Sequence, residues 1–203
     1  MPSTPVPLSS QAIAPRVPQP TGQLLVFTGP SGVGKGTLLR QLLKQHPDIQ
    51  LSISATTRKP RPGEEHGKDY YFVSRPEFEA MVEQRKLLEW AQFAGNFYGT
   101  PRQPLEAMVA KGHTVILEIE LDGARQVRNS LPGARQIFVL PPNLEELEAR
   151  IRGRGQDSDD AIAKRMARAQ IEIAAAPEFD IQIVNDNLEQ AVKALELAVF
   201  TPQ

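Results

Sequence analysis

The stretch from Thr28 to Thr37 reads "TGPSGVGKGT" and decides the fold of this chain. A phosphate-binding loop has the pattern glycine, any four residues, glycine, lysine, and then serine or threonine. Gly29, Gly34 and Lys35 satisfy the first part of that pattern. Gly36 stands where the hydroxyl residue is usual. The first question is whether this loop still holds a nucleotide.

The flanks of the loop supply the context that a glycine motif needs. "LLVF" (Leu24–Phe27) is a short apolar run, typical of a buried strand. "TLLRQLLKQH" follows the loop, and its leucines recur at helical spacing. The order is therefore strand, glycine loop, helix, which is the arrangement that binds polyphosphates.

The loop residues themselves indicate how a phosphate would be held. Glycines let the backbone turn tightly and point successive N–H groups inward, and Lys35 adds a positive charge near the terminal phosphates. A tight turn with an incidental lysine is the plainer alternative, but four features in the correct context argue against it. The expected ATP-binding residues of the loop are Gly29, Pro30, Ser31, Gly32, Val33, Gly34, Lys35, Gly36 and Thr37.

The glycine at position 36 bears on the metal. Because the hydroxyl comes one residue late, at Thr37, it is rotated away from the usual Mg²⁺ position. We therefore expect Mg²⁺ to be held mainly by ATP phosphates and water, which suits an ion that keeps much of its hydration shell. The sequence predicts no dedicated protein metal ligand.

Composition excludes several classes of protein. The chain has 203 residues, of which 40% are hydrophobic and 23% charged, and its net charge is −1. That balance is ordinary for a globular domain and argues against nonspecific nucleic-acid binding. The absence of cysteine excludes disulfides and thiol catalysis, and no apolar run approaches the roughly 20 residues of a membrane helix. We expect a cytoplasmic protein without a nucleic-acid or membrane partner.

The remaining pattern divides the chain into regions. Residues 1–21 are rich in proline, and we expect a disordered tail there, without a signal-peptide pattern. Apolar runs at Thr114–Glu120, Gln136–Leu140 and Ile181–Asn185 alternate with helical segments. This predicts an α/β core from 22–52 and 102–203, with a mainly parallel sheet covered on both faces in three layers.

Residues 53–101 interrupt that alternation. They are rich in Arg, Pro, Gly, Tyr and Phe, which indicates an insertion of small antiparallel strands with a short helix after Pro76. Arg58 and Arg61, with tyrosines nearby, can clamp a dianionic phosphate, although a solvated basic turn is the plainer alternative. Glu89 sits in the apolar stretch "LLEWAQF" and either faces solvent or reads a base.

Several stretches together resemble the guanylate kinase family. "TTRKPRPGE", "GKDYYFV", "EWAQFAGNFYGT", "GRG" and "IVND" occur in the family's order between about Gln23 and Phe200. The resemblance implies a P-loop core, a small mixed α/β GMP-binding insertion at 53–101 and a helical lid at 141–168. It also implies transfer of the γ-phosphoryl group of ATP to GMP, and to dGMP, in purine nucleotide metabolism.

The resemblance also assigns roles to individual residues. It implies that Lys35, Arg58, Arg150, Arg154 and Arg165 are catalytic and that Asn185 borders the adenine of ATP. Arg152 and Arg168 are expected to be solvated or secondary. The residues implied to bind GMP are Ser54, Arg58, Arg61, Tyr70, Glu89, Tyr98, Thr100 and Glu120.

Glu89 and Glu120 need separate comment. One carboxylate at Glu89 can accept from both N1–H and N2–H₂ of guanine, whereas the N1 lone pair of adenine would face it unfavourably. Where relatives carry "LDID", this chain has "LEIE", so Glu118 and Glu120 each reach one methylene further. Two residues apart on a strand, they are expected to share one face. Direct Mg²⁺ ligation by them stays open.

Two alternatives remain at this point. A guanylate-kinase-like protein-interaction module reuses the GMP cleft without catalysis, but its loop and lid arginines tend to be lost, whereas Lys35, Arg154 and Arg165 are present here. A kinase for another nucleoside monophosphate, such as AMP or UMP, shares the loop but not the "TTRKPRPGE" stretch. No obligatory protein partner is expected.

Overall fold

A computed structural model of the chain describes residues 22–93, 95–153 and 158–201. Its central sheet has five strands, all parallel, in the order β2-β7-β1-β8-β9. The strands are β1 (Gln23–Thr28), β2 (Gln50–Leu51), β7 (Thr114–Glu118), β8 (Arg135–Leu140) and β9 (Ile181–Val184). The predicted parallel sheet is thus confirmed.

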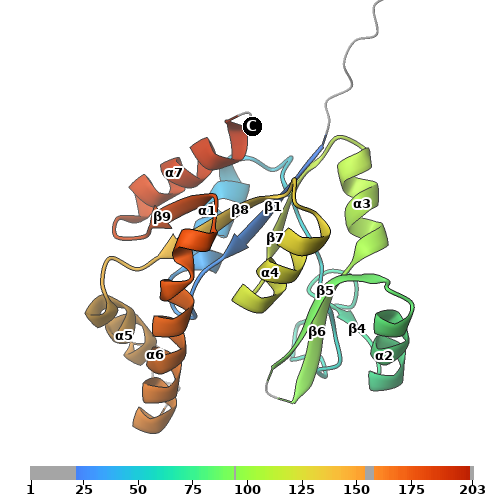
Figure 1. Cartoon of the computed structure of the whole chain (residues 1–203), viewed down its shortest axis with the longest axis horizontal. Helices are drawn as coiled ribbons and strands as arrows, with labels where there is room; N and C mark the ends of the chain where they lie inside the picture. The colour runs from blue at the N-terminus through green and yellow to red at the C-terminus, as the bar shows by residue number, and fades with distance from the viewer. Residues whose placement is uncertain (1–21, 94, 154–157, 202–203) are drawn as a thin grey trace, which may run out of the picture.

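Both faces of this sheet are buried because apolar residues follow one another in its central strands, as at residues 24–27 of β1 and 137–140 of β8. Leu25 and Phe27 of β1 face one core, which α1 (Lys35–Gln45) and α7 (Leu188–Phe200) complete. Val26 faces a second core beneath α3 (Arg102–Ala110) and α4 (Leu121–Ser130). Figure 1 shows these two helix pairs on opposite sides of the sheet. The predicted three-layer architecture follows from this double burial.

The strand expected at Thr114–Glu120 is shorter than predicted. β7 ends at Glu118, and Glu120 is the N-cap of α4, a helix that the sequence pattern alone did not delimit. The two glutamates therefore do not share one strand face. In the structure α4 packs against β1 and β5, and its buried residues include Leu121, Ala124 and Val127.

The insertion forms a second sheet, in the order β4-β3-β6-β5. Its elements are β3 (Ala55–Thr56), β4 (Tyr71–Phe72), α2 (Arg75–Glu83), β5 (Leu87–Phe93) and β6 (Asn96–Pro101). The expectation of antiparallel strands is wrong for β3 and β4, which pair in parallel. The loop 57–70 joins them and is long enough for the crossover that a parallel pair needs. The short helix predicted after Pro76 is present as α2.

Two helices of the predicted lid region lie within the described residues. They are α5 (Leu144–Arg152), capped by Asn143, and α6 (Asp159–Ala174), capped by Ser158 and followed by the short helix η1 (Ala176–Glu178). In Figure 1, α5 and α6 extend past the sheet on one side and the β5–β6 hairpin on the other. None of the helices in the described ranges has the length and apolar character needed to cross a membrane.

Candidate nucleotide-binding site

The glycine loop is a rigid backbone turn at the end of β1. Gly29, Gly32 and Gly34 have φ values of 145°, 91° and 101°, a region that residues with a side chain rarely adopt. The space around them is also closed. A Cβ atom on Gly29 would stand 2.4 Å from the carbonyl oxygen of Val139, and one on Gly34 would stand 2.5 Å from Nδ2 of Asn185. These glycines are therefore required by geometry.

Gly36 differs from the other loop glycines. A Cβ atom there would meet nothing closer than 3.9 Å, at the guanidinium of Arg40. The next residue, Thr37, has its hydroxyl engaged within α1, where Arg40 Nη2 donates to Thr37 Oγ1 at 3.0 Å. The structure therefore has room for a side chain at position 36, and packing does not explain why this residue is glycine.

Lys35 lies across the mouth of the loop. Its Nζ donates to the carbonyl oxygens of Gly29 at 2.6 Å and of Pro30 at 3.2 Å. This holds the ammonium group beside the N-terminus of α1, where backbone N–H groups and the helix dipole also favour an anion. The lysine therefore stands where the sequence analysis expects terminal phosphates.

Asn185 and Arg150 support the loop from the core. Asn185 Nδ2 donates to the carbonyl oxygen of Val33 at 2.8 Å, and Arg150 Nη1 donates to the carbonyl oxygen of Asn185 at 2.9 Å. Arg150 Nη1 is also 3.4 Å from Val33 O, and its Nε donates to Glu146 at 3.1 Å. These bonds show a structural function for both residues, in addition to the roles that the resemblance implies.

A second cluster of the expected site residues lies in the insertion, around Arg58. Its two terminal nitrogens donate to both carboxylate oxygens of Glu64, at 2.8 and 3.0 Å. The backbone N–H of Arg61 also donates to Glu64, at 2.7 Å. These contacts hold the pKa of Glu64 below its ordinary value, with the Arg58 hydrogen bond as the main cause. A carboxylate thus occupies the fork that a phosphate would use.

Aromatic rings form the wall beside Arg58. Its guanidinium carbon lies 5.3 Å from the centroid of the Tyr70 ring, and the rings of Tyr70 and Tyr98 meet edge to face at 6.2 Å. The structure therefore brings together Arg58, Tyr70 and Tyr98, three of the residues implied to bind GMP. Glu64 was missed from the sequence, although an acid three residues after Arg61 was a signal that could have been read.

Glu89 lies at the closed end of a cavity of about 360 Å³. Glu89 is only 5% exposed, and the hydroxyl of Thr100 donates to Glu89 Oε1 at 2.6 Å. Burial raises the pKa of Glu89, and the bond from Thr100 opposes that rise. Ser54 and Tyr98 line the same cavity. The solvent-facing reading of Glu89 is therefore excluded.

Helix α4 sets the position of Glu89. A Cβ atom on Gly123 would stand 2.6 Å from Glu89 Oε2, so this residue has to be glycine for the carboxylate to lie where it does. Gln126, on the same helix, donates to the carbonyl oxygen of Trp90 at 2.8 Å and accepts from its N–H at 3.1 Å. Neither residue was singled out from the sequence, because nothing local to them indicates contact with β5.

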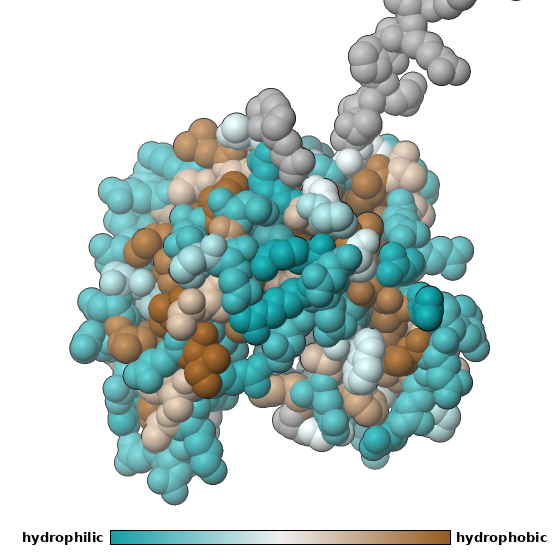
Figure 2. Space-filling view, viewed as in Figure 1, coloured by the Kyte–Doolittle hydropathy of each residue, from teal (hydrophilic) through white to brown (hydrophobic). Residues whose placement is uncertain are grey.

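A second cavity, of about 390 Å³, adjoins the first. Gly29, Ser31, Lys35 and Arg165 line it on the side of the loop and the lid. Its lining shares with the Glu89 cavity the residues Tyr70, Phe93, Glu118, Ile119, Glu120 and Arg168. Figure 2 shows a notch between two lobes at the lower edge of the molecule, where the lid and the insertion extend. Two adjoining cavities suit two ligands whose reacting ends meet.

Charged side chains line the boundary between these cavities. Glu118 is the last residue of β7 and lies at this boundary. Burial raises its pKa, while the charges of Lys35 and Arg40 act in the opposite direction.

Arg152 pairs with Glu148 and Asp159 on the surface, as expected. Arg168, expected to be secondary, instead lies in the lining of both cavities. Arg154 lies outside the described residues.

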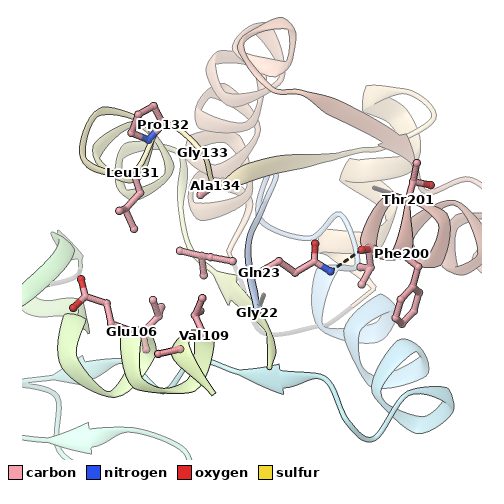
Figure 3. A pocket seen from close by; sticks show the side chains of 14 residues that line it. Gly22, Gln23, Glu106, Val109, Leu131, Pro132, Gly133, Ala134, Phe200 and Thr201 are labelled. Atoms are coloured by element: carbon pink, nitrogen blue, oxygen red, sulfur yellow. Dashed lines mark hydrogen bonds between the residues drawn. The ribbon is translucent and has the colours of Figure 1, made fainter. Parts of the chain in front are cut away.

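A larger cavity, of about 820 Å³, lies at the other end of the sheet (Figure 3). Gln23, the first residue of β1, lines it, whereas the glycine loop follows the last residue of that strand. Its lining is mostly apolar, and Figure 3 shows Val109 and Leu131 pointing into it. It has none of the convergent polar groups that mark a nucleotide site.

These features define a class of protein. A parallel sheet with a glycine loop after β1, an arginine fork on an insertion and a lid helix that carries Arg165 and Arg168 are features of a P-loop nucleotide kinase, which moves a phosphoryl group between two bound nucleotides. Comparison with known proteins specifies the class further. Residues 21–201 match the model of the family described as guanylate kinase.

Individual relatives agree with that match. The chain is 68% identical to a guanylate kinase of Thermosynechococcus vestitus, over 91% of this chain and 96% of the relative. It is 61% identical to a guanylate kinase of a Nostoc species, over 89% and 90% of the two chains. A crystal structure of guanylate kinase from Anaplasma phagocytophilum superposes with a TM-score of 0.71 at 35% identity, covering 89% of this chain and 86% of that one. The chain belongs to the guanylate kinase family.

Proposed function

We propose that this chain transfers the γ-phosphoryl group of ATP to GMP and dGMP, giving GDP or dGDP and ADP. The observation that carries this proposal is the buried carboxylate of Glu89 in a cavity that adjoins the one at the glycine loop. Family membership supports it independently.

Base selection follows from the chemistry of Glu89. Guanine presents N1–H and N2–H₂ side by side, and an ionised carboxylate accepts from both. Because the site is buried, a base that leaves the carboxylate unpaired carries the full cost of desolvation. Thr100 donates to Glu89 and thereby orients it, so its contribution to guanine recognition runs partly through the glutamate. Ser54 lines the same cavity and supplies a hydroxyl for O6.

The two phosphates would be held from opposite sides. The GMP phosphate displaces Glu64 from the fork of Arg58, assisted by Arg61, Tyr70 and Tyr98. The ATP phosphates lie on the loop N–H groups with Lys35. A phosphate oxygen of GMP then attacks the γ-phosphorus in line while the bond to the ADP oxygen breaks. The protein contributes position and positive charge.

Lid arginines complete the positive surroundings of the transferred group. Arg165 already lines the cavity beside Lys35. Arg154 and Arg150 are further candidates through the family resemblance, and Arg150 would act while also supporting the loop. Asn185, held against Val33, marks the side of the loop on which the adenine of ATP would lie.

The residues at the site fit a Mg²⁺ ion bound mainly through substrate. Among the described residues there is no group of three or more His, Asp or Glu side chains that could hold a metal. Mg²⁺ is commonly bound by one or two carboxylates together with phosphates and water. Glu118 and Glu120 are the carboxylates that line both cavities, and the charge of Lys35 acts on Glu118. The ion would neutralise phosphate charge there.

Partners and location follow from the same proposal. ATP and GMP are the expected partners, with no nucleic acid, membrane or obligatory protein partner, and the proposed compartment is the cytoplasm. The support is the family membership and the near-neutral composition of the chain.

A substrate panel tests the function. Wild-type protein is assayed with ATP and Mg²⁺ against GMP, dGMP, AMP and UMP in a coupled ADP-release assay. GMP and dGMP should be turned over, and AMP and UMP should be poorer by orders of magnitude. Lys35→Met should remain folded and lose turnover by about 10² or more, since the γ-phosphate loses its main charge partner. Preference for AMP or UMP would overturn the assignment, and binding of GMP without turnover would favour an interaction module.

A further inference from the structure

Arg168 projects from the middle of α6 into the boundary of the two cavities. It lines both of them, and among the residues that line both it is the one cation. The other five are Tyr70, Phe93, Glu118, Ile119 and Glu120. A lid residue therefore reaches the place where the two substrates would meet.

The contacts of Arg168 join three parts of the fold. Its Nη2 donates to Glu120 Oε2 at 2.5 Å, at the N-cap of α4 in the core. Its Nε donates to Glu172 Oε1 at 2.9 Å, one turn further along α6. The guanidinium carbon lies 5.9 Å from the centroid of the Phe93 ring in the insertion. Lid, core and insertion thus meet at one planar group.

Glu172 fixes the orientation of the Arg168 guanidinium group. It is 8% exposed, so its carboxylate needs a partner, and Arg168 supplies one through Nε. A guanidinium fixed at Nε keeps its terminal nitrogens in one plane, because the group is rigid and planar. Nη2 therefore points at Glu120, and the guanidinium group does not sample other orientations in the cavity.

Glu120 benefits from such a restraint. Its side chain is 55% exposed and has three rotatable bonds, so without a partner it would occupy several rotamers. The bond from Arg168 selects the one that lies in the lining of the Glu89 cavity. It also neutralises a carboxylate that would otherwise repel the phosphate of GMP.

We propose that Arg168 is a positioning residue for GMP: it holds Glu120 in the lining of the GMP site and ties that site to the lid helix α6. This rests on the proposed function, in which the Glu89 cavity receives guanine. Arg168 acts through Glu120, so its effect falls on GMP binding and not on ATP binding.

The test is a double-mutant cycle of Arg168→Met and Glu120→Gln, with Arg168→Lys as the conservative variant. KM is measured for GMP at saturating ATP and for ATP at saturating GMP, and GMP binding is measured by calorimetry without ATP. Arg125→Met is the matched control, because Arg125 pairs with Glu178 at 2.5 Å on the surface and lines neither cavity.

We expect Arg168→Met to raise KM and Kd for GMP about tenfold while KM for ATP changes less than about twofold. The double variant should be no worse than the poorer single variant, since both remove the same contact. Arg168→Lys should fall between, because a lysine keeps the charge and loses the planar geometry. Arg168→Met should melt lower than Arg125→Met, because it removes the partner of the buried Glu172 carboxylate, whereas Arg125 pairs with the more exposed Glu178.

Other outcomes are equally clear. If KM for GMP and for ATP rise by the same factor, or the effects of the two single variants multiply, Arg168 does not act through Glu120 and the proposal is overturned. An unchanged Kd for GMP in folded Arg168→Met also overturns it. Should Arg168→Met not fold, the Arg168→Lys and Glu120→Gln data decide. Wild-type protein that does not bind GMP would refute the proposed function instead.

Discussion

At the scale of the residue, substitution of Glu89 should have the largest effect on the choice between GMP and AMP. In Glu89→Gln one acceptor oxygen becomes an NH₂ donor that points at a guanine donor. A site built to hydrogen-bond its substrate can favour it over an analogue that lacks the bonding group by about 10⁴–10⁵ in kcat/KM. Loss of one such bond should therefore remove part of the preference for GMP. We expect kcat/KM for GMP to fall by roughly 10² or more while that for AMP changes little. Steady-state kinetics with both nucleotides measure this.

Two comparisons make the Glu89 result specific. Arg58→Ala should weaken GMP and AMP alike, because the phosphate contacts carry no information about the base. Equal losses for the two nucleotides in Glu89→Gln would instead mean that Glu89 is structural and that another residue reads the base.

The same residue should limit stability in a pH-dependent way. Burial raises the pKa of Glu89 in the folded protein, so the folded state binds the proton more tightly than the unfolded state. Ionised Glu89 therefore destabilises the fold above its raised pKa, and this penalty vanishes as the pH falls below the ordinary glutamate value of about 4.3. Removing the charge should relieve the penalty at neutral pH.

We expect Glu89→Gln to melt about 2–4 °C higher than wild type near pH 8, the shift that about 1 kcal/mol produces in a chain of this size. The advantage should shrink as the pH is lowered through the raised pKa of Glu89, because the wild-type carboxyl group then takes up its proton. Thermal melts across this range measure it, with Glu83→Gln, an exposed site of the insertion, as control. A constant or reversed difference would contradict the burial argument.

At the scale of the element, α4 packs against β5 and sets the position of Glu89 in the proposed GMP site. In Gly123→Ala the new Cβ would stand 2.6 Å from Glu89 Oε2, so the carboxylate has to move. We expect KM for GMP to rise about tenfold or more with little change for ATP. Stability should be nearly kept, because alanine is favoured over glycine in a helix by about 1 kcal/mol.

Gly133→Ala provides the control for this prediction, since a Cβ there meets nothing within 4 Å. Both variants are compared by kinetics and thermal melts. Normal GMP kinetics in Gly123→Ala would show that β5 can shift away from α4 without loss, against the hydrogen bonds that Gln126 makes to Trp90.

At the scale of the whole molecule, the N-terminal tail is expected to be dispensable. Residues 1–21 lie outside the described part of the chain, and β1, which begins at Gln23, pairs with β7 on one side and with β8 on the other. Deleting residues 2–20 should leave the melting temperature and GMP kinetics unchanged within error. Differential scanning calorimetry and the coupled assay check this. A loss of several degrees would show that the tail packs on the core.

Local pattern was sufficient for much of the architecture. The order strand, glycine loop, helix at Leu24–Gln45 can be read from spacing alone, because glycine and apolar periodicity act within a few residues. The parallel sheet follows from the alternation of strands and helices. The phosphate loop could also be selected from its own pattern, whereas Arg58, Tyr70 and Glu89 were assigned through the resemblance to the guanylate kinase family.

Only the tertiary structure decided the relations between distant residues. That Glu64 fills the fork of Arg58, that Gly123 abuts Glu89, and that Arg168 reaches Glu120 depend on contacts across loops, sheets and the lid. The end of β7 at Glu118 and the parallel pairing of β3 with β4 depend likewise on where the chain next packs. Short-range preferences are weak compared with the burial that long-range packing provides, so such features emerge only in the folded chain.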